Sequence, residues 1–237
     1  METAQVSADS FHLTPEQQQA VGFLTEYSKQ MVVTAFHGNP TPASASSLIK
    51  EIYQVCDQVM ARCLRSGAQL PCEQGCDWCC YLRVKATPLE VLCVVDYLQF
   101  ILNASELATV RQRITATDEI TRGMDGHRRA SAKKICPLVV DNQCLVYPVR
   151  PIACRIYHSL NPADCELSLE DDQRRLNIRL DIFCMGIGIC EGLADGLRAA
   201  GYQAPSLELI AGLRMAMDEP GLITRWLAGA PAFKAAE

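Results

Sequence analysis

Residues 72–80 read CEQGCDWCC, which places four cysteines among nine residues. Cys72, Cys76 and Cys79 follow a C-x3-C-x2-C spacing, Trp78 comes directly before the third, and Cys80 is adjacent to it. Either three spaced thiols act alone or all four belong to a larger set. Several thiols in one loop can converge on a single point, as metal ligands must. This stretch therefore predicts a metal site around which the rest of the chain folds.

The composition is that of an ordinary globular protein. The chain has 237 residues, of which 49% are hydrophobic and 21% charged. This length suits one domain, or one domain with appendages, and can bury a sizeable core. The net charge of −5 argues against nucleic acid or an anionic membrane as the main partner.

The thirteen cysteines are the unusual feature of the composition. The first ten residues, METAQVSADS, have neither the basic nor the apolar region of a secretory signal, and no run of 18 apolar residues is present. We therefore expect a cytoplasmic protein without a membrane span. In a reducing compartment many cysteines indicate metal rather than disulfides, and an odd count also argues against complete pairing.

Helical signals dominate both ends of the chain. Thr14, Pro15 and Gln17 form a capping-box pattern that predicts a helix from there to about residue 36. A second helix is expected over 46–66, and Thr87 with Glu90 predicts a third that ends near residue 102. A polar helix is expected over 105–134, broken near Gly123 and Gly126.

The middle of the chain changes character. Residues 136–149, CPLVVDNQCLVYPV, predict two short strands around the turn at 141–143. Arg150 and Pro151 begin a short helical turn that carries Cys154, and LNPADCELSLEDD (160–172) is expected to be a loop. The predicted fold is mainly α with a small irregular β element, its helices packed around a cysteine-rich metal-binding core. It divides into an N-terminal helical segment (1–69), a cysteine-cluster region (70–167) and a C-terminal helical segment (168–237), together forming one compact domain.

The cysteines separate by context. Cys56, Cys63 and Cys93 lie on apolar helix faces and are expected to pack as small hydrophobic side chains. A second set lies in turns beside glycine, proline and polar residues, and we predict that its members are metal ligands: Cys72, Cys76, Cys79, Cys80, Cys136, Cys144, Cys154 and Cys165.

Eight thiols supply two four-ligand sites or one bridged binuclear site, because zinc and four-iron clusters each take four protein ligands. Adjacent Cys79 and Cys80 project in different directions, which makes one mononuclear ion an awkward occupant for both. Four thiolates around a divalent ion leave an excess negative charge. Three arginines are candidates to offset it: Arg83, Arg150 and Arg155.

These residues resemble the YkgJ-type cysteine-cluster family, a zinc- or iron-chelating domain. Its pattern is an opening like C-x3-C-x2-C-C, then Cys-Pro, then Cys-x-apolar-Tyr-x-x-Arg-Pro-x-x-Cys-Arg, and a last cysteine about ten residues on. The resemblance covers roughly residues 70–167. The matching positions are Cys72, Cys76, Cys79, Cys80, Cys136, Pro137, Cys144, Tyr147, Arg150, Pro151, Cys154, Arg155 and Cys165. It implies chelation of zinc or iron, including a four-iron cluster, rather than a defined reaction.

Weaker patterns have ordinary explanations. FCMGIGICEG (183–192) is one residue too long for a dinucleotide fingerprint and is expected to form a tight apolar turn, with Cys184 and Cys190 in the core. His158 is expected to pack or face solvent rather than bind metal. The basic stretch HRRASAKK (127–134) is expected to be a solvated helix face.

The sequence therefore supports a metal-binding cysteine-cluster protein with a structural, redox or metal-delivery role. A first alternative is a radical S-adenosylmethionine enzyme, since Cys72, Cys76 and Cys79 have its loop spacing and leave one iron open. A second is a protein-lysine N-methyltransferase, because the family also resembles the cluster region of flagellin lysine N-methylases. The expected partner is a metal ion, and no catalytic residue can be assigned.

Overall fold

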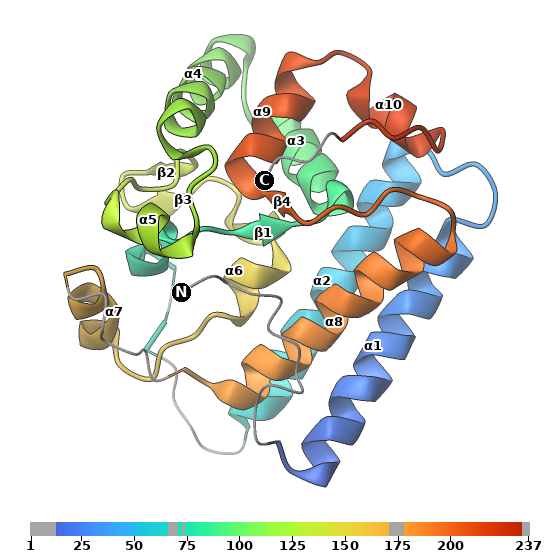
Figure 1. Ribbon diagram of the computed structural model, residues 1–237, viewed down its shortest axis with the longest axis horizontal. Coiled ribbons are helices and arrows are strands. Elements are labelled where there is room, and N and C mark those ends of the chain that lie inside the picture. Colours follow the sequence, from blue (N-terminus) through green and yellow to red (C-terminus); the bar gives the residue numbers. More distant parts are fainter. Residues whose placement is uncertain (1–12, 66–70, 73, 171–177, 234–237) are drawn as a thin grey trace.

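The protein is mainly helical and carries two small antiparallel sheets (Figure 1). A computed structural model describes residues 13–65, 71–72, 74–170 and 178–233. The elements are α1 (Pro15–Ala35), α2 (Pro42–Leu64), the 3-10 turn η2 (Trp78–Tyr81), β1 (Lys85–Ala86), α3 (Pro88–Ile101), α4 (Ala104–Thr121), α5 (Gly126–Ser131), β2 (Val139–Val140), β3 (Gln143–Cys144), the 3-10 turn η3 (Tyr147–Val149), α6 (Ile152–Ile156), α7 (Pro162–Ser168), α8 (Leu180–Ala199), β4 (Leu207–Glu208), α9 (Leu209–Asp218) and α10 (Leu222–Leu227).

The predicted helix starts are largely confirmed. Thr14 caps α1 and Thr87 caps α3, and in each case the side chain three residues on completes a capping box. Helix α2 begins earlier than the expected residue 46. The Thr41 hydroxyl accepts a hydrogen bond from the Ser44 backbone N–H, and the Thr41 backbone N–H donates one to the Ser44 hydroxyl. Pro42 occupies the first helical position.

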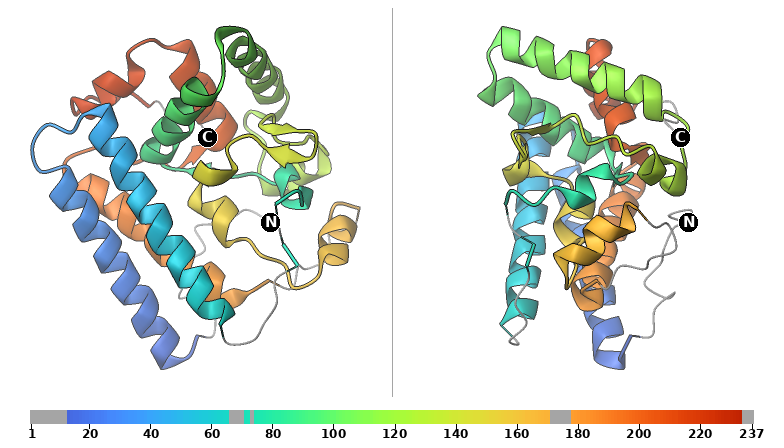
Figure 2. Two further views of the ribbon diagram at one scale, coloured as in Figure 1. Left: turned by 180° about the vertical axis from the view of Figure 1, so that it is seen from behind. Right: turned by 90° about the vertical axis from the view of Figure 1, so that its left-hand side faces the viewer.

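Helices α1 and α8 lie side by side along their length (Figures 1 and 2). The glycines of 183–192 lie inside α8, so the expected tight turn there was wrong. A Cβ on Gly192 would lie 2.1 Å from the Thr25 carbonyl oxygen of α1, and one on Gly186 would lie 2.1 Å from Ile156. These glycines let α8 approach its neighbours closely, which outweighs their poor helix propensity.

The predicted hairpin is confirmed as β2 and β3, with Val139 opposite Cys144. Its two turn residues, Asp141 and Asn142, have φ angles of 49° and 59°, a conformation that both residue types tolerate. The second sheet pairs β1 with β4, with Lys85 opposite Glu208. It joins the cysteine region to the C-terminal segment, a pairing that the sequence pattern did not predict.

Two further expectations concern polar segments. The predicted break in the polar helix is confirmed, since α4 and α5 are separate and Gly123 between them has a φ of 73°. The expected loop over 160–172 was wrong for its described part. Asn161 caps α7 and Pro162 opens it, so Cys165 lies on a helix.

The main core lies among α2, α3, α8 and α9, and Ile49, Leu92 and Leu193 are examples of its buried side chains. Within the part of the chain that is described, no helix is both long and apolar enough to cross a lipid bilayer. Helix α1 packs on α8, and β1 pairs with β4. These contacts connect the N-terminal and cysteine-cluster segments to the C-terminal segment.

Candidate metal centre

The eight predicted ligands come from four separate stretches of the chain, namely residues 72–80, residues 136–144, Cys154 and Cys165. Four are in or before η2, two are in the hairpin region, and Cys154 and Cys165 lie on α6 and α7. In Figure 1, β2, β3 and α7 lie toward the left-hand side, and α6 lies nearer the centre. All thirteen cysteines belong to the described residues, and none forms a disulfide.

The first subset, the hairpin group, consists of Cys80, Cys136, Cys144 and Cys154. The backbone N–H of Cys136 donates to the Cys80 carbonyl at 2.8 Å, which holds the two cysteine-bearing segments together. Burial raises the pKa of Cys154 well above its ordinary value, and negative charge on Cys79, Cys136 and Cys144 raises it further. These four thiols are therefore electrostatic neighbours.

The second subset, the α7 group, consists of Cys72, Cys76 and Cys165. The Cys72 sulfur lies 3.7 Å from the Ser159 carbonyl oxygen, close to the start of α7. Burial raises the pKa of Cys72 to about 11, and negative charge on Cys76, Cys165 and Cys79 adds to the increase. Cys165 is 7% exposed because α7 turns it inward.

Cys79 links the two groups. Its thiol is hydrogen bonded to that of Cys80, and this bond lowers the pKa of Cys79 and raises that of Cys80. The two thiols therefore lie within reach of each other, although their side chains were expected to project in different directions. Charge on Cys79 also raises the pKa of Cys165 and of Cys144. Cys79 thus lies at the junction of the hairpin group and the α7 group.

The thiols match zinc or iron in the type of ligand atom but not in how the side chains are placed. Thiolates are the ligands that structural zinc and iron–sulfur clusters take. Among the described residues, however, no set of three or more His, Cys, Asp or Glu side chains is placed to hold a metal ion. Cysteines that bind a metal do so as thiolates, so the ligand thiols would lose their protons on binding.

Of the three candidate cations, Arg150 is the one that acts on the predicted ligands. Its guanidinium lies 3.8 Å from the centre of the Tyr147 ring, and its charge opposes the burial-driven increase in the pKa values of Cys144 and Cys154. Arg155 instead turns toward α2, where its Nη1 lies 2.7 Å from Asp57. The Nε of Arg83 is buried without a hydrogen-bond partner.

A further cation, Arg129, was missed. The basic stretch that contains it was expected to be a solvated helix face, and for Arg129 this was wrong, because its side chain is 2% exposed. Its neighbour Arg128 is exposed as expected. The sequence carried no signal that distinguishes the two arginines, since only the phase of the short helix α5 decides which one points inward.

The remaining cysteines occupy packing positions. Cys56, Cys93 and Cys184 are buried, and Cys63 and Cys190 pack against the core. His158 is partly buried. Its Nε2 lies 2.6 Å from the Arg155 carbonyl oxygen and 3.3 Å from the Met60 sulfur, so this nitrogen already has close neighbours.

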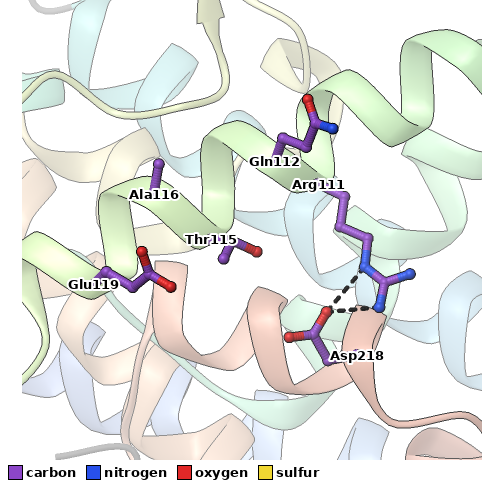
Figure 3. A pocket seen from close by; sticks show the side chains of 6 residues that line it. All are labelled: Arg111, Gln112, Thr115, Ala116, Glu119 and Asp218. Atoms are coloured by element: carbon purple, nitrogen blue, oxygen red, sulfur yellow. Dashed lines mark hydrogen bonds and ion pairs between the residues drawn. The ribbon is translucent and has the colours of Figure 1, made fainter.

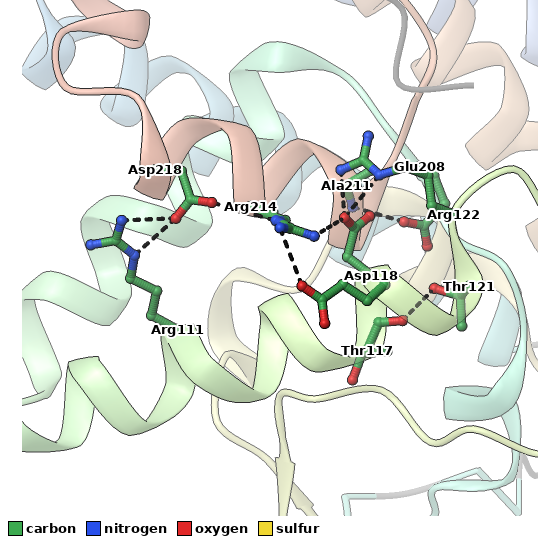
Figure 4. A network of polar contacts seen from close by, with 10 residues as sticks. Arg111, Thr117, Asp118, Thr121, Arg122, Glu208, Ala211, Arg214 and Asp218 are labelled. Atoms are coloured by element: carbon green, nitrogen blue, oxygen red, sulfur yellow. Dashed lines mark hydrogen bonds and ion pairs between the residues drawn. The ribbon is translucent and has the colours of Figure 1, made fainter.

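A shallow hollow of about 420 Å³ lies elsewhere, on α4 and α9 (Figure 3). Arg111 and Asp218 in its wall already form an ion pair at 2.8 Å. Figure 4 shows that the charges continue into a network in which Asp118 of α4 accepts from Arg122 and Arg214. This network fastens α4 to α9. No nucleophile with an adjacent base lines the hollow, so it offers no catalytic arrangement.

The chain was compared with protein-family models, with curated proteins and with solved structures, and none of the three comparisons found a match. The fold and the gathered cysteines are therefore the observations on which a function can be argued.

Proposed function

We propose that this protein binds zinc or iron, as single ions or as an iron–sulfur cluster, through the hairpin group, the α7 group and Cys79. The observation that supports the proposal is that eight loop and short-helix cysteines from four separate stretches of chain act on one another's pKa values. Thiols that merely fill a core need not lie near one another, whereas those of a metal centre must. The role would be structural, redox or metal delivery.

The neighbour relations favour a division into two four-thiol sites. Cys80, Cys136, Cys144 and Cys154 would form one site, and Cys79 would complete the α7 group as the other. Because the charge on Cys79 raises the pKa of Cys144 and of Cys154, we assign Cys79 the position between the two proposed sites. Arg150 would offset part of the negative charge that the bound thiolates carry.

A radical S-adenosylmethionine enzyme is less well supported. That chemistry normally uses a βα-barrel, and such a barrel is built from parallel strands with intervening helices. The strands in the described residues are two residues long and antiparallel. That reading also leaves five of the eight cysteines without a role. No arrangement of the described side chains favours a lysine methyltransferase.

The test is anaerobic purification of the full chain, followed by metal and acid-labile sulfide analysis and an absorption spectrum. Bound zinc without colour, or iron with sulfide and broad visible absorption, would support the proposal. Protein that carries neither metal, and takes up neither when it is supplied under reducing conditions, would refute it.

Serine variants test the ligand assignment. We expect Cys154→Ser and Cys165→Ser each to lower the metal content by about half, because each would disable one four-thiol site. The matched control is Cys56→Ala, which removes a buried thiol outside both groups and should cost packing but no metal. Full metal content in both serine variants would contradict the assignment.

A further inference from the structure

We propose that Arg129 is a positioning residue for the hairpin group, holding Cys80 and Cys136 in register through the backbone carbonyls beside them. The inference rests on the proposed metal-binding function and adds to it a residue outside the cysteine pattern. Arg129 lies on α5, seven residues before Cys136 in the chain.

The guanidinium joins two stretches that carry predicted ligands. Nη1 of Arg129 donates to the Tyr81 carbonyl oxygen at 2.9 Å and also to the Lys134 carbonyl oxygen. Tyr81 directly follows Cys80, and Lys134 comes two residues before Cys136. The Cys136 N–H donates to the Cys80 carbonyl oxygen next to these contacts. Arg129 and this backbone bond therefore join the same two segments of chain at adjacent positions.

Arg129 is buried, so its guanidinium depends on the polar groups around it. A guanidinium that is 2% exposed needs polar partners, since burying a charge without them is costly. The hydrogen bonds of its Nη1 go to neutral carbonyls, and its Nε is buried with no partner. Burial lowers the pKa of Arg129, and the negative charge of Glu208 opposes this shift.

Glu208 is not a dedicated counter-ion, because its carboxylate caps α9 by accepting the Ala211 N–H at 2.9 Å. Arg129 would fix the spacing of Cys80 and Cys136 through its hydrogen bonds to the Tyr81 and Lys134 carbonyl oxygens. Partners that orient metal ligands in this way typically change metal affinity 10- to 100-fold.

The experiment compares Arg129→Met with Arg128→Met, which removes the adjacent, exposed arginine of the same helix. Each full-length variant is loaded with zinc or cobalt(II) under reducing conditions, and affinity is measured by competition with a chromophoric chelator. We expect Arg129→Met to lower the affinity of one site by about 10- to 100-fold and to weaken the thiolate-to-cobalt absorption, with the helical circular dichroism unchanged. Arg128→Met should match the parent protein.

Arg129→Lys covers the case in which Arg129→Met does not fold. Lysine keeps the charge and one donor but lacks the planar fork, so we expect it to fold and to bind with an affinity between those of Arg129→Met and the parent. Parent-like affinity and cobalt spectra in whichever Arg129 variant folds would overturn the inference while leaving the metal-binding proposal intact. A parent protein that binds no metal would overturn both.

Discussion

Glu90 shows how a single buried side chain can connect two elements. It is 2% exposed and completes the capping box of α3, where its Oε2 accepts from the Thr87 N–H at 2.7 Å. Its Oε1 accepts from the Ile152 N–H at 2.9 Å, at the first residue of α6. One carboxylate therefore satisfies the starts of two helices, and the second helix carries Cys154.

We predict that Glu90→Gln lowers the free energy of unfolding by about 1–3 kcal/mol, because an amide has one oxygen in place of two and leaves a buried donor unsatisfied. Urea unfolding followed by circular dichroism measures this. The control is Glu51→Gln on the exposed face of α2, which should change stability by less than about 0.5 kcal/mol. Equal effects of the two substitutions would show that the carboxylate of Glu90 has no special role.

The pH dependence of this difference has a definite sign. Burial raises the pKa of Glu90 above its ordinary value of 4.5, against the opposing effect of its hydrogen bonds. The folded state therefore holds the proton to higher pH than the unfolded state does. The stability that Glu90 contributes is greatest below pH 4.5 and falls as the pH rises through the folded-state pKa. The deficit of Glu90→Gln should accordingly be largest in acid, and a deficit that grows with pH would contradict this.

At the scale of elements, the contact of α1 with α8 depends on the absence of side chains. Gly192 faces the backbone of α1, where a Cβ would meet the Thr25 carbonyl oxygen at 2.1 Å and the Ser28 Cβ at 3.0 Å. Backbone atoms cannot give way as a flexible side chain can. The two helices would have to separate, and the apolar surface between them would lose contact.

We predict that Gly192→Ala lowers stability by about 1–3 kcal/mol, although alanine is the better helix former. Gly22→Ala on α1 is the matched control, because a Cβ there meets nothing within 4 Å. That substitution should raise stability by about 0.5–1 kcal/mol through helix propensity alone. Thermal melts of both variants measure the contrast, and a stabilised Gly192→Ala protein would show that the helices can separate at little cost.

At the scale of the whole molecule, two kinds of support coexist. The helices α1, α2, α3, α8 and α9 share an apolar core that needs no ligand. The elements that carry or adjoin the predicted ligands are short: the 3-10 turns η2 and η3, the two-residue strands β2 and β3, and the helices α6 and α7. Such a region would gain stability from the proposed metal, since metal that binds only the folded state contributes its binding free energy to folding.

We predict that removing metal with a chelator lowers the melting temperature and acts locally. Metal at about 1,000 times its dissociation constant stabilises by about 4 kcal/mol. In the metal-free protein, hydrogen exchange should accelerate at the Cys136 N–H and across the β2–β3 hairpin, while α1 and α8 keep their protection. Exchange that accelerates equally in α1 and α8, or nowhere, would argue against a local metal centre.

The sequence by itself determined the starts of α1 and α3, the hairpin and the grouping of cysteines by context. These features depend on neighbours within a few residues: Thr14 with Gln17, or Asp141 with Asn142 in a turn that favours positive φ. The eight predicted ligands were likewise chosen from their local surroundings. Their assignment as ligands stays a prediction.

Only the tertiary structure decided what depends on residues that are distant in the chain. It turned the glycine stretch of 183–192 into a helix, because close packing against α1 outweighs local turn preference. It paired β1 with β4, and it buried Arg129 while leaving the adjacent Arg128 exposed. A local pattern cannot specify these choices, since the free energy that decides them comes from contacts made only once the chain has folded. The stretch CEQGCDWCC supplies four of the thiols. Tertiary packing decided that Arg129 lies next to it and donates to the carbonyl oxygens of Tyr81 and Lys134.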